Sequence, residues 1–243
     1  MIHFNSKYRS TQREIMDDLE FQGAEMKNLL VDLKKVNRWL GGNKITLNGL
    51  SVLLKNLPED QEIKIIDIGC GDGEILRKCA ELANRKGVEV NCIGIDFNPN
   101  IIAMAKAKSI AYSNISFQTK DVFSVEKSIP NCDIALATLF IHHFNDEKVM
   151  ILLSQLIEKS RAGVVINDLH RSRIAFVLFK IVSRLFLKTA TARHDGAVSI
   201  ARGFKRNELK AFSDTIENHK SKITWRWAFR YQWILKKQVI SKF

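Results

Sequence analysis

Glycines and carboxylates alternate in the stretch DIGCGDGE, which runs from Asp67 to Glu74. Glycine leaves the backbone bare and reaches positive φ angles, so a ligand can lie directly against such a loop. Asp67 and Asp72 flank the glycines and would repel a phosphate group. A phosphate-binding loop would also place Lys and then Ser or Thr after its last glycine, where Glu74 and Ile75 stand instead. The loop therefore predicts a cationic or zwitterionic ligand.

Two further acids follow at the ends of apolar runs, Asp96 after VEVNCIGI and Asp121 after ISFQTK. A carboxylate at the first position can accept hydrogen bonds from both hydroxyls of a ribose. The second acid is placed to accept a hydrogen bond from an exocyclic amine. A nucleoside with a positively charged amino-acid tail satisfies both acids and the glycine loop. These residues therefore predict S-adenosylmethionine as the cofactor.

The elements that must bring these residues together follow from the hydrophobic pattern. From Ile63 onward, apolar runs of strand length alternate with longer helix-like segments. This alternation predicts a mainly parallel, doubly wound α/β sheet, in which the carboxyl ends of the strands form one ligand-binding edge. We expect strands over 63–68, 88–96, 115–121, 133–140 and 162–169, and helices over 74–86, 98–110 and 146–159.

Three segments flank this alternating core. The stretch Lys222–Lys237 holds two β-rich runs with barely room for a turn, which predicts a hairpin and thus an antiparallel strand. Glu14–Gly42 has a helical apolar period and predicts a helical cap. Arg171–Ser213 is an insertion whose first part is strongly apolar, and it predicts a lid. We expect one domain, divided into a helical N-terminal cap (1–60), a cofactor-binding core (61–169), a lid (170–213) and a C-terminal hairpin (214–243).

Four segments at successive strand ends resemble the class I S-adenosylmethionine-dependent methyltransferases: DIGCGDGE, GIDFNPN, TKDVF and DIALATLFIHHF. The resemblance covers Ile63–Leu169 and the terminal hairpin. It implies a Rossmann-like, mainly parallel seven-stranded sheet with an antiparallel C-terminal hairpin strand. It also implies an enzyme that transfers a methyl group from S-adenosylmethionine and releases S-adenosylhomocysteine.

The resemblance assigns cofactor contacts to individual positions of the chain. The implied residues are Asp67, Gly69, Gly71 and Asp72 for the methionine moiety, Asp96 for the ribose, Phe97, Asp121 and Val122 for the adenine, and Thr138 and Leu139 beside the sulfonium. Outside the matched region, Arg38 and Trp39 precede two glycines. We expect Arg38 to close over the cofactor.

The class of acceptor follows from the fourth strand end, which reads TLFIHHF. Enzymes of this fold that methylate amines of nucleic-acid bases commonly carry an Asn/Asp-Pro-Pro-aromatic signature there, so this activity is disfavoured. A pyrimidine C5 mechanism would need a cysteine in that region, whereas Cys132 stands before the expected strand. The segments VNRWLGG, NDLHRSRIAF and RHDGAVSIARGF more loosely resemble bacterial small-molecule methyltransferases near the quinone and aromatic-polyketide enzymes. We expect methyl transfer to an oxygen or activated carbon of a lipophilic, aromatic or quinone-like molecule.

A phenolic or carbon acceptor must lose a proton, and histidine is suited to accept it near neutral pH. The histidines near the expected site or in the lid are His142, His143, His170 and His194. We favour His194 as the base because Asp195 adjoins it in a polar part of the lid, and we place His143 second. A structural role for either histidine is an open alternative.

Charge and cysteine usage limit the partners. The net charge is +12 and the pI about 9.6, and seven Lys and Arg residues but no acid lie between His219 and Phe243. The basic charge leaves three interpretations open: the protein methylates RNA, it is a non-catalytic S-adenosylmethionine-binding regulator, or the basic residues form a solvated edge with no partner. The apolar insertion leaves open peripheral membrane contact. The four cysteines have no metal-ligand spacing, so we expect no metal, and we expect a cytoplasmic protein.

Overall fold

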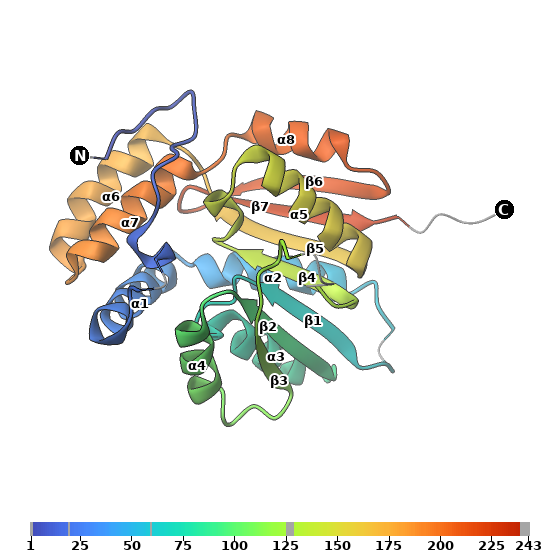
Figure 1. Ribbon diagram of the computed structural model, residues 1–243. Helices are drawn as coiled ribbons and strands as arrows, with labels where there is room; N and C mark the ends of the chain where they lie inside the picture. Colours follow the sequence, from blue (N-terminus) through green and yellow to red (C-terminus); the bar gives the residue numbers. More distant parts are fainter. Residues whose placement is uncertain (1, 19, 59, 125–128, 239–243) are drawn as a thin grey trace.

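A computed structural model of the chain describes residues 2–18, 20–58, 60–124 and 129–238 (Figure 1). Within these residues, seven strands form one sheet in the order β3-β2-β1-β4-β5-β7-β6. The strands are β1 (Ile63–Ile68), β2 (Val90–Asp96), β3 (Ile115–Thr119), β4 (Cys132–Thr138), β5 (Ser160–Leu169), β6 (His219–Arg226) and β7 (Arg230–Lys237). Lys242, one of the seven C-terminal cations, lies outside the described residues.

Strand direction confirms the predicted fold class. The strands β1 to β5 pair in parallel, whereas β7 pairs antiparallel with both β5 and β6. The strand order reverses beside β1, since the chain runs outward to β3 on one side and returns to β4 on the other. Ligands in open α/β sheets bind outside the carboxyl ends of the strands at this reversal.

Two layers of helices cover the sheet, which is the arrangement that a doubly wound fold requires. One face packs against α2 (Gly42–Leu54), α3 (Glu74–Arg85) and α4 (Pro99–Lys108), and the other against α5 (Asp146–Lys159) and α8 (Arg206–Thr215). Local sequence sets the helix starts. The Asn98 side chain accepts hydrogen bonds from the first turn of α4, where Pro99 supplies a preset φ angle.

A third group of helices lies to one side of the sheet (Figure 1). It comprises the short 3-10 helix η1 (Ile15–Asp17), α1 (Gly23–Trp39), α6 (Arg173–Phe186) and α7 (Ala190–Arg202). Met26 and Leu29 of α1 pack in one apolar cluster with Leu187 and Ala192. The predicted cap and lid therefore contact each other. In the described part of the chain, no helix combines the length and apolar content needed for a bilayer span.

The boundaries of several elements differ from the prediction. The N-terminal part of the chain, expected to be a helical cap over 1–60, holds the helices α1 and α2, between which the chain turns at Gly41 with a φ of 67° in the left-handed region. The helical apolar period was recognised over Glu14–Gly42, and α2 lies beyond it. The fourth strand begins at Cys132, which was placed before it, and ends at Thr138. Cys132 still lies at the amino end of β4, away from the ligand-binding edge.

Candidate active site

A pocket of about 160 Å³ lies at the carboxyl ends of β1 and β4. The loop between β1 and α3 forms one wall, and Thr138 and Leu139 at the end of β4 form another. Helix α1 closes the pocket with Leu30, Leu33 and Asn37. The structure thus brings together six of the residues expected to bind the cofactor, namely Asp67, Gly69, Gly71, Asp72, Thr138 and Leu139.

Two glycines in the loop are required by its geometry. Gly69 and Gly71 have φ angles of 67° and 53°, a region that costs other residues energy. A Cβ atom at Gly69 would lie 2.1 Å from the ring of Phe140, so that ring packs on bare backbone. A Cβ atom at Gly71 would meet nothing within 4 Å, which leaves the backbone there open to a ligand.

Two carboxylates lie at this edge of the sheet, the buried Asp67 in the pocket lining and the half-buried Asp96 next to Gly71. Asp67 is 1% exposed, and its Oδ1 atom has no hydrogen-bond partner among the described residues. Burial, and then the neighbouring charge of Asp96, raises the pKa of Asp67 well above its usual value. Burial likewise raises the pKa of Asp96, although the backbone N–H groups of Gly71 and Asn98 donate to its two oxygens. An orphaned buried carboxylate of this kind calls for a cationic partner.

Asp72 differs from Asp67 because its charge is already neutralised. Its Oδ2 atom lies 2.6 Å from Nζ of Lys108, and its Oδ1 atom lies 3.6 Å from Arg77. Burial opposes ionisation, but Lys108 and Arg77 outweigh it and lower the pKa of Asp72. Of the two acids that were expected to repel phosphate, Asp72 is therefore already paired, and Asp67 is the one with an oxygen that lacks a hydrogen-bond partner among the described residues.

The residues expected at the adenine lie beyond this pocket. Phe97 follows β2 with 46% of its surface exposed, so its ring is free to stack on a flat ligand. The Asp121 side chain is exposed and accepts a hydrogen bond from the backbone N–H of Phe123. The Val122 side chain packs in the hydrophobic core between the sheet and α5, so its predicted contact would fall to its backbone.

Polar side chains missed by sequence reasoning support the end of β4. The hydroxyls of Thr46 and Thr138 lie 2.9 Å apart, and the amide of Asn167 donates to the Thr46 hydroxyl. Leu139 has a φ of 53° and donates its N–H to the Asn167 carbonyl. A non-glycine residue in this region marks local strain, which concentrates at functional sites. No sequence signal singled out Thr46, because it lies beyond the stretch Glu14–Gly42 in which a helical apolar period was recognised.

Helix α1 presents Asn37, and not Arg38, to the pocket. Leu30, Leu33, Lys34 and Asn37 follow the i, i+3, i+4, i+7 spacing of one helix face and all line the pocket. Asn37 accepts a hydrogen bond from Nη1 of Arg230, at 2.8 Å, and donates one to Asn43.

The structure places Arg38 on the exposed side of α1, outside the pocket lining. Trp39 is also exposed and packs edge-on against Phe186 of α6. The helical spacing from Leu30 could have identified Asn37 in the sequence.

His142 is a buried cation. Its Nδ1 atom lies 2.7 Å from Oδ1 of Asp168, and its Nε2 atom lies 3.3 Å from Oε1 of Glu14. Burial would lower the pKa of His142, but Asp168 and Glu14 outweigh it and raise that pKa to about 9. Burial opposes ionisation of Glu14 as well, yet His143, His142 and Ser199 lower its pKa to about 2. A histidine that stays protonated is unable to act as a general base.

His143 packs against this ion pair from the turn after β4. Its ring stacks on that of His142 with centroids 4.4 Å apart, and its side chain is 16% exposed. Its Nδ1 atom lies 3.0 Å from Oδ1 of Asp17, and its Nε2 atom lies 3.9 Å from Glu14. Its ring centroid lies 6.4 Å from that of Phe140, and the Phe140 ring packs over Gly69 of the pocket loop.

His194 lies on α7 and does not line the pocket. Its Nδ1 atom is 2.8 Å from Oδ1 of Asp195. Asp195 is fully buried, and its carboxylate accepts hydrogen bonds from the backbone N–H groups of Ile15 and Met16. The pair thus fastens the N-terminal segment to α7. His170 is likewise outside the pocket and accepts a hydrogen bond from the indole of Trp225.

Glu14 was not singled out from the sequence, although both histidines at the end of β4 face it. Glu14, His142 and His143 each offer a ligand atom within 4.8 Å of the others, so this group could also hold a metal ion. In the structure the same atoms contact one another at ion-pair distance. The cluster is therefore balanced by its own charges.

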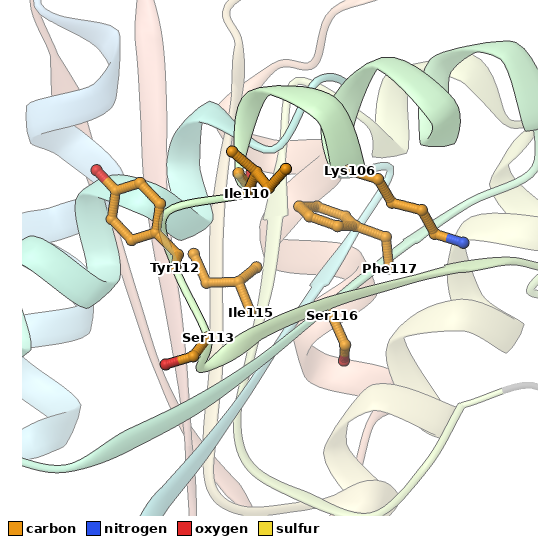
Figure 2. Close-up of a pocket in the computed structure, with 8 residues that line it drawn as sticks. Lys106, Ile110, Tyr112, Ser113, Ile115, Ser116 and Phe117 are labelled. Carbon is orange, nitrogen blue, oxygen red and sulfur yellow. The ribbon is translucent and has the colours of Figure 1, made fainter.

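A second, larger depression of about 490 Å³ lies between α4 and the amino end of β3 (Figure 2). Ile110, Ile115 and Phe117 line it, and Lys106 and Tyr112 direct their polar ends outward. It holds no convergent charged groups and lies at the opposite end of the strand from the ligand-binding edge. The smaller pocket is therefore the candidate active site.

Comparison with known proteins agrees with this geometry. Residues 59–232 match the model of a methyltransferase domain family. The fold resembles the plantazolicin methyltransferase BpumL in complex with SAH (14% identity, 89% of this chain and 95% of that chain, TM-score 0.64). It also resembles the magnesium protoporphyrin IX methyltransferase ChlM from Synechocystis PCC 6803 with bound SAH (16% identity, 85% and 87%, TM-score 0.56).

A third similar structure is the CMeT domain of the citrinin polyketide synthase, at 16% identity, with 79% of this chain, 51% of that chain and a TM-score of 0.59. No curated protein matches significantly. The family match spans the β1 loop, Asp67, Asp96 and β6, and it ends within β7. The chain therefore belongs to the methyltransferase domain family and has the fold of the class I S-adenosylmethionine-dependent methyltransferases.

Proposed function

We propose that the protein transfers a methyl group from S-adenosylmethionine to an oxygen or activated carbon of a lipophilic, aromatic or quinone-like small molecule. The observation that carries this proposal is the character of the pocket lining, in which Leu30 and Leu33 of α1 form an apolar side. Lys34 is the one cation of that lining, against three acids, whereas an RNA strand would need a basic groove. The similar methyltransferases named for plantazolicin and magnesium protoporphyrin IX are consistent with a small acceptor.

The residues of the pocket fit the cofactor. The unpartnered Oδ1 atom of Asp67 is an acceptor for the ammonium group of the methionine moiety, and the bare backbone at Gly71 allows the close approach. Asp96 would accept the ribose hydroxyls, and the exposed ring of Phe97 would stack on the adenine. Asp121 would accept a hydrogen bond from the exocyclic amine of the adenine. Thr138 and Leu139 would lie beside the sulfonium.

When bound, S-adenosylmethionine supplies an electrophilic methyl group. The chain must orient the acceptor in line with that group and remove a proton from it. His143 is the imidazole best placed to accept the proton, since Asp17 and Glu14 hold its ring near Phe140, which packs on the pocket loop at Gly69. Because His142 stays protonated, it would fix the position of His143 without exchanging a proton.

The proposal is tested with the purified full-length chain, S-adenosylmethionine, and a set of alkylated phenols and hydroquinones. We expect release of S-adenosylhomocysteine together with a product one methylene heavier than the acceptor. The matched control is the fully O-methylated ether of each acceptor, which has no hydroxyl proton to lose and should give no O-methylation. Turnover with an RNA transcript and none with phenols would replace this proposal by RNA methylation. Cofactor binding without turnover on either would indicate a regulator.

A further inference from the structure

Helix α6 leaves an unusual amount of apolar surface uncovered. Seven of its fourteen residues are large hydrophobic side chains that are exposed, including Ile174 at 65% and Leu185 at 75%. The complete set is Ile174, Val177, Leu178, Ile181, Val182, Leu185 and Phe186. Exposed apolar patches on soluble proteins are rarely this concentrated unless they bind something.

The exposed side chains form one continuous stripe. Their spacing of three and four residues places them on one side of a helix about 21 Å long. Phe176 and Ser183 lie on the other side and are buried, and Ala175 is buried at the edge of the stripe. Two of these, Ala175 and Phe176, pack in a cluster with Ala197 and Ile200 of α7. The helix therefore has its own buried face, and the exposed stripe is additional to the one that the fold uses. We call these seven residues the α6 stripe.

Cations run along one edge of the α6 stripe. By helical position, Arg173, Lys180 and Arg184 share one line beside Val177 and Ile181. All three are exposed, and none has a carboxylate within 4.0 Å among the described residues. No Asp or Glu occurs between positions 169 and 194. These charges thus remain available to an external anion.

Two exposed tryptophans belong to elements beside α6. Trp39 at the end of α1 packs edge-on against Phe186, with ring centroids 5.3 Å apart. Trp227 in the turn between β6 and β7 lies 6.2 Å from Phe229, which packs in the same cluster as Phe176. In Figure 1, α6 lies at the outer side of the molecule, away from the sheet. Tryptophan is the residue enriched where a protein meets the headgroup region of a bilayer.

We propose that the α6 stripe docks on an anionic membrane surface. Apolar side chains would enter the boundary between headgroups and acyl chains, while Arg173, Lys180 and Arg184 would contact anionic headgroups. A second copy of the chain is the weaker occupant, because it would bring two unpaired basic edges together. The surface also suits the activity, since Trp39 joins the stripe to α1, the helix that closes the pocket. The inference stands independently of the proposed function, because membrane binding is measured with no acceptor present.

The test is co-sedimentation of the full-length chain with vesicles made of equal parts phosphatidylcholine and phosphatidylglycerol, compared with phosphatidylcholine alone. We expect binding to the anionic vesicles that weakens with added salt and is lower on the neutral ones. The double substitution Ile181→Ser and Leu185→Ser should lower the partition coefficient by about tenfold or more, because two apolar side chains no longer leave water. Lys180→Glu and Arg184→Glu together should abolish the preference for anionic lipid.

Matched controls separate the stripe from general surface effects. Ile110→Ser, at a site that is 90% exposed beyond α4, and Lys210→Glu on α8 should leave the partition coefficient unchanged. The stripe variants remove only exposed side chains, and their unfolding transitions should match that of the wild type. Absence of binding to anionic vesicles would overturn the proposal, as would equal binding by the Ile181→Ser, Leu185→Ser variant. A concentration-independent dimer that this variant converts to monomer would assign the stripe to a second copy instead.

Discussion

The Oε1 atom of Glu14 lies 3.3 Å from Nε2 of His142, and this contact joins the N-terminal segment to the turn after β4. Both side chains are buried, at 5% and 2% exposure. Asp168 of β5 holds the other ring nitrogen of His142, so the imidazolium is clamped between two carboxylates. The same Glu14 faces His143 beside the cofactor pocket. Glu14 thus links the N-terminal segment both to the buried His142 and to the candidate base His143.

Substitution of Glu14 by Gln should destabilise the protein by about 3 kcal/mol, because a buried imidazolium loses one of its two counter-charges. Gln keeps the shape and can still accept a hydrogen bond from Ser199. Urea unfolding at neutral pH measures the effect. Glu25→Gln on the exposed side of α1 is the matched control and should change the free energy of unfolding by less than about 0.5 kcal/mol. Equal effects of the two substitutions would show that the contact contributes nothing to stability.

The raised pKa of His142 predicts how stability depends on pH. Its pKa is about 9 in the folded protein against an ordinary value of 6.5, so its contribution is fully present below pH 6.5 and is lost as the pH rises through 9. The difference between the two limits is about 3 kcal/mol. Buried thiols such as Cys92 also destabilise the folded state at alkaline pH. The measurement is therefore the difference in unfolding free energy between wild type and His142→Gln, which should shrink from pH 6.5 to pH 9.5. A constant difference would contradict a protonated His142.

Kinetic measurements distinguish the two candidate bases, His143 and His194. His143→Gln should lower kcat by about a hundredfold and leave the dissociation constant of S-adenosylmethionine almost unchanged, because it removes a proton acceptor. His194→Gln should change kcat by less than about threefold, since His194 does not line the pocket and its partner Asp195 binds backbone. Single-turnover rates and cofactor titrations distinguish these effects. A larger loss in the His194 variant would restore the sequence-based preference.

The face of α1 that closes the pocket is tested at neighbouring positions. Asn37→Ala should weaken cofactor binding by about tenfold, since it leaves the buried Arg230 without the acceptor that Asn37 provides. Arg38→Ala should change the affinity by less than about twofold, because Arg38 is on the exposed side of the helix. Calorimetric titration with S-adenosylmethionine gives both values. The opposite order would place Arg38 over the cofactor, as expected from the sequence.

Much of the fold was predictable because β1, β2, β4 and β5 are buried on both faces and therefore read as continuous apolar runs. The hairpin was predictable from two β-rich runs separated by a tight turn, β6 and β7. Glycines and acids at strand ends identified the pocket, since the topology of the sheet brings those ends together.

The rest of the site depends on long-range packing that no local pattern encodes. Glu14 lies in an irregular segment and acquires its role only through contact with His142 and His143. Asp195 was interpreted as the partner of a catalytic His194. In the structure its carboxylate also accepts hydrogen bonds from the backbone N–H groups of Ile15 and Met16. Helix α2 has neither a side-chain cap nor a long apolar period, and its polar residue Thr46 was missed.

The central claim, that this pocket binds S-adenosylmethionine through the carboxylate at the end of β2, is tested most directly by calorimetric titration of the wild type and the Asp96→Ala variant. We predict saturable one-to-one binding by the wild type and an affinity at least about a hundredfold lower in the variant, because two hydrogen bonds to a charged acceptor are lost. Asp214→Ala, an exposed acid on α8, should bind as the wild type does. Wild-type affinity in the Asp96→Ala variant would contradict the account.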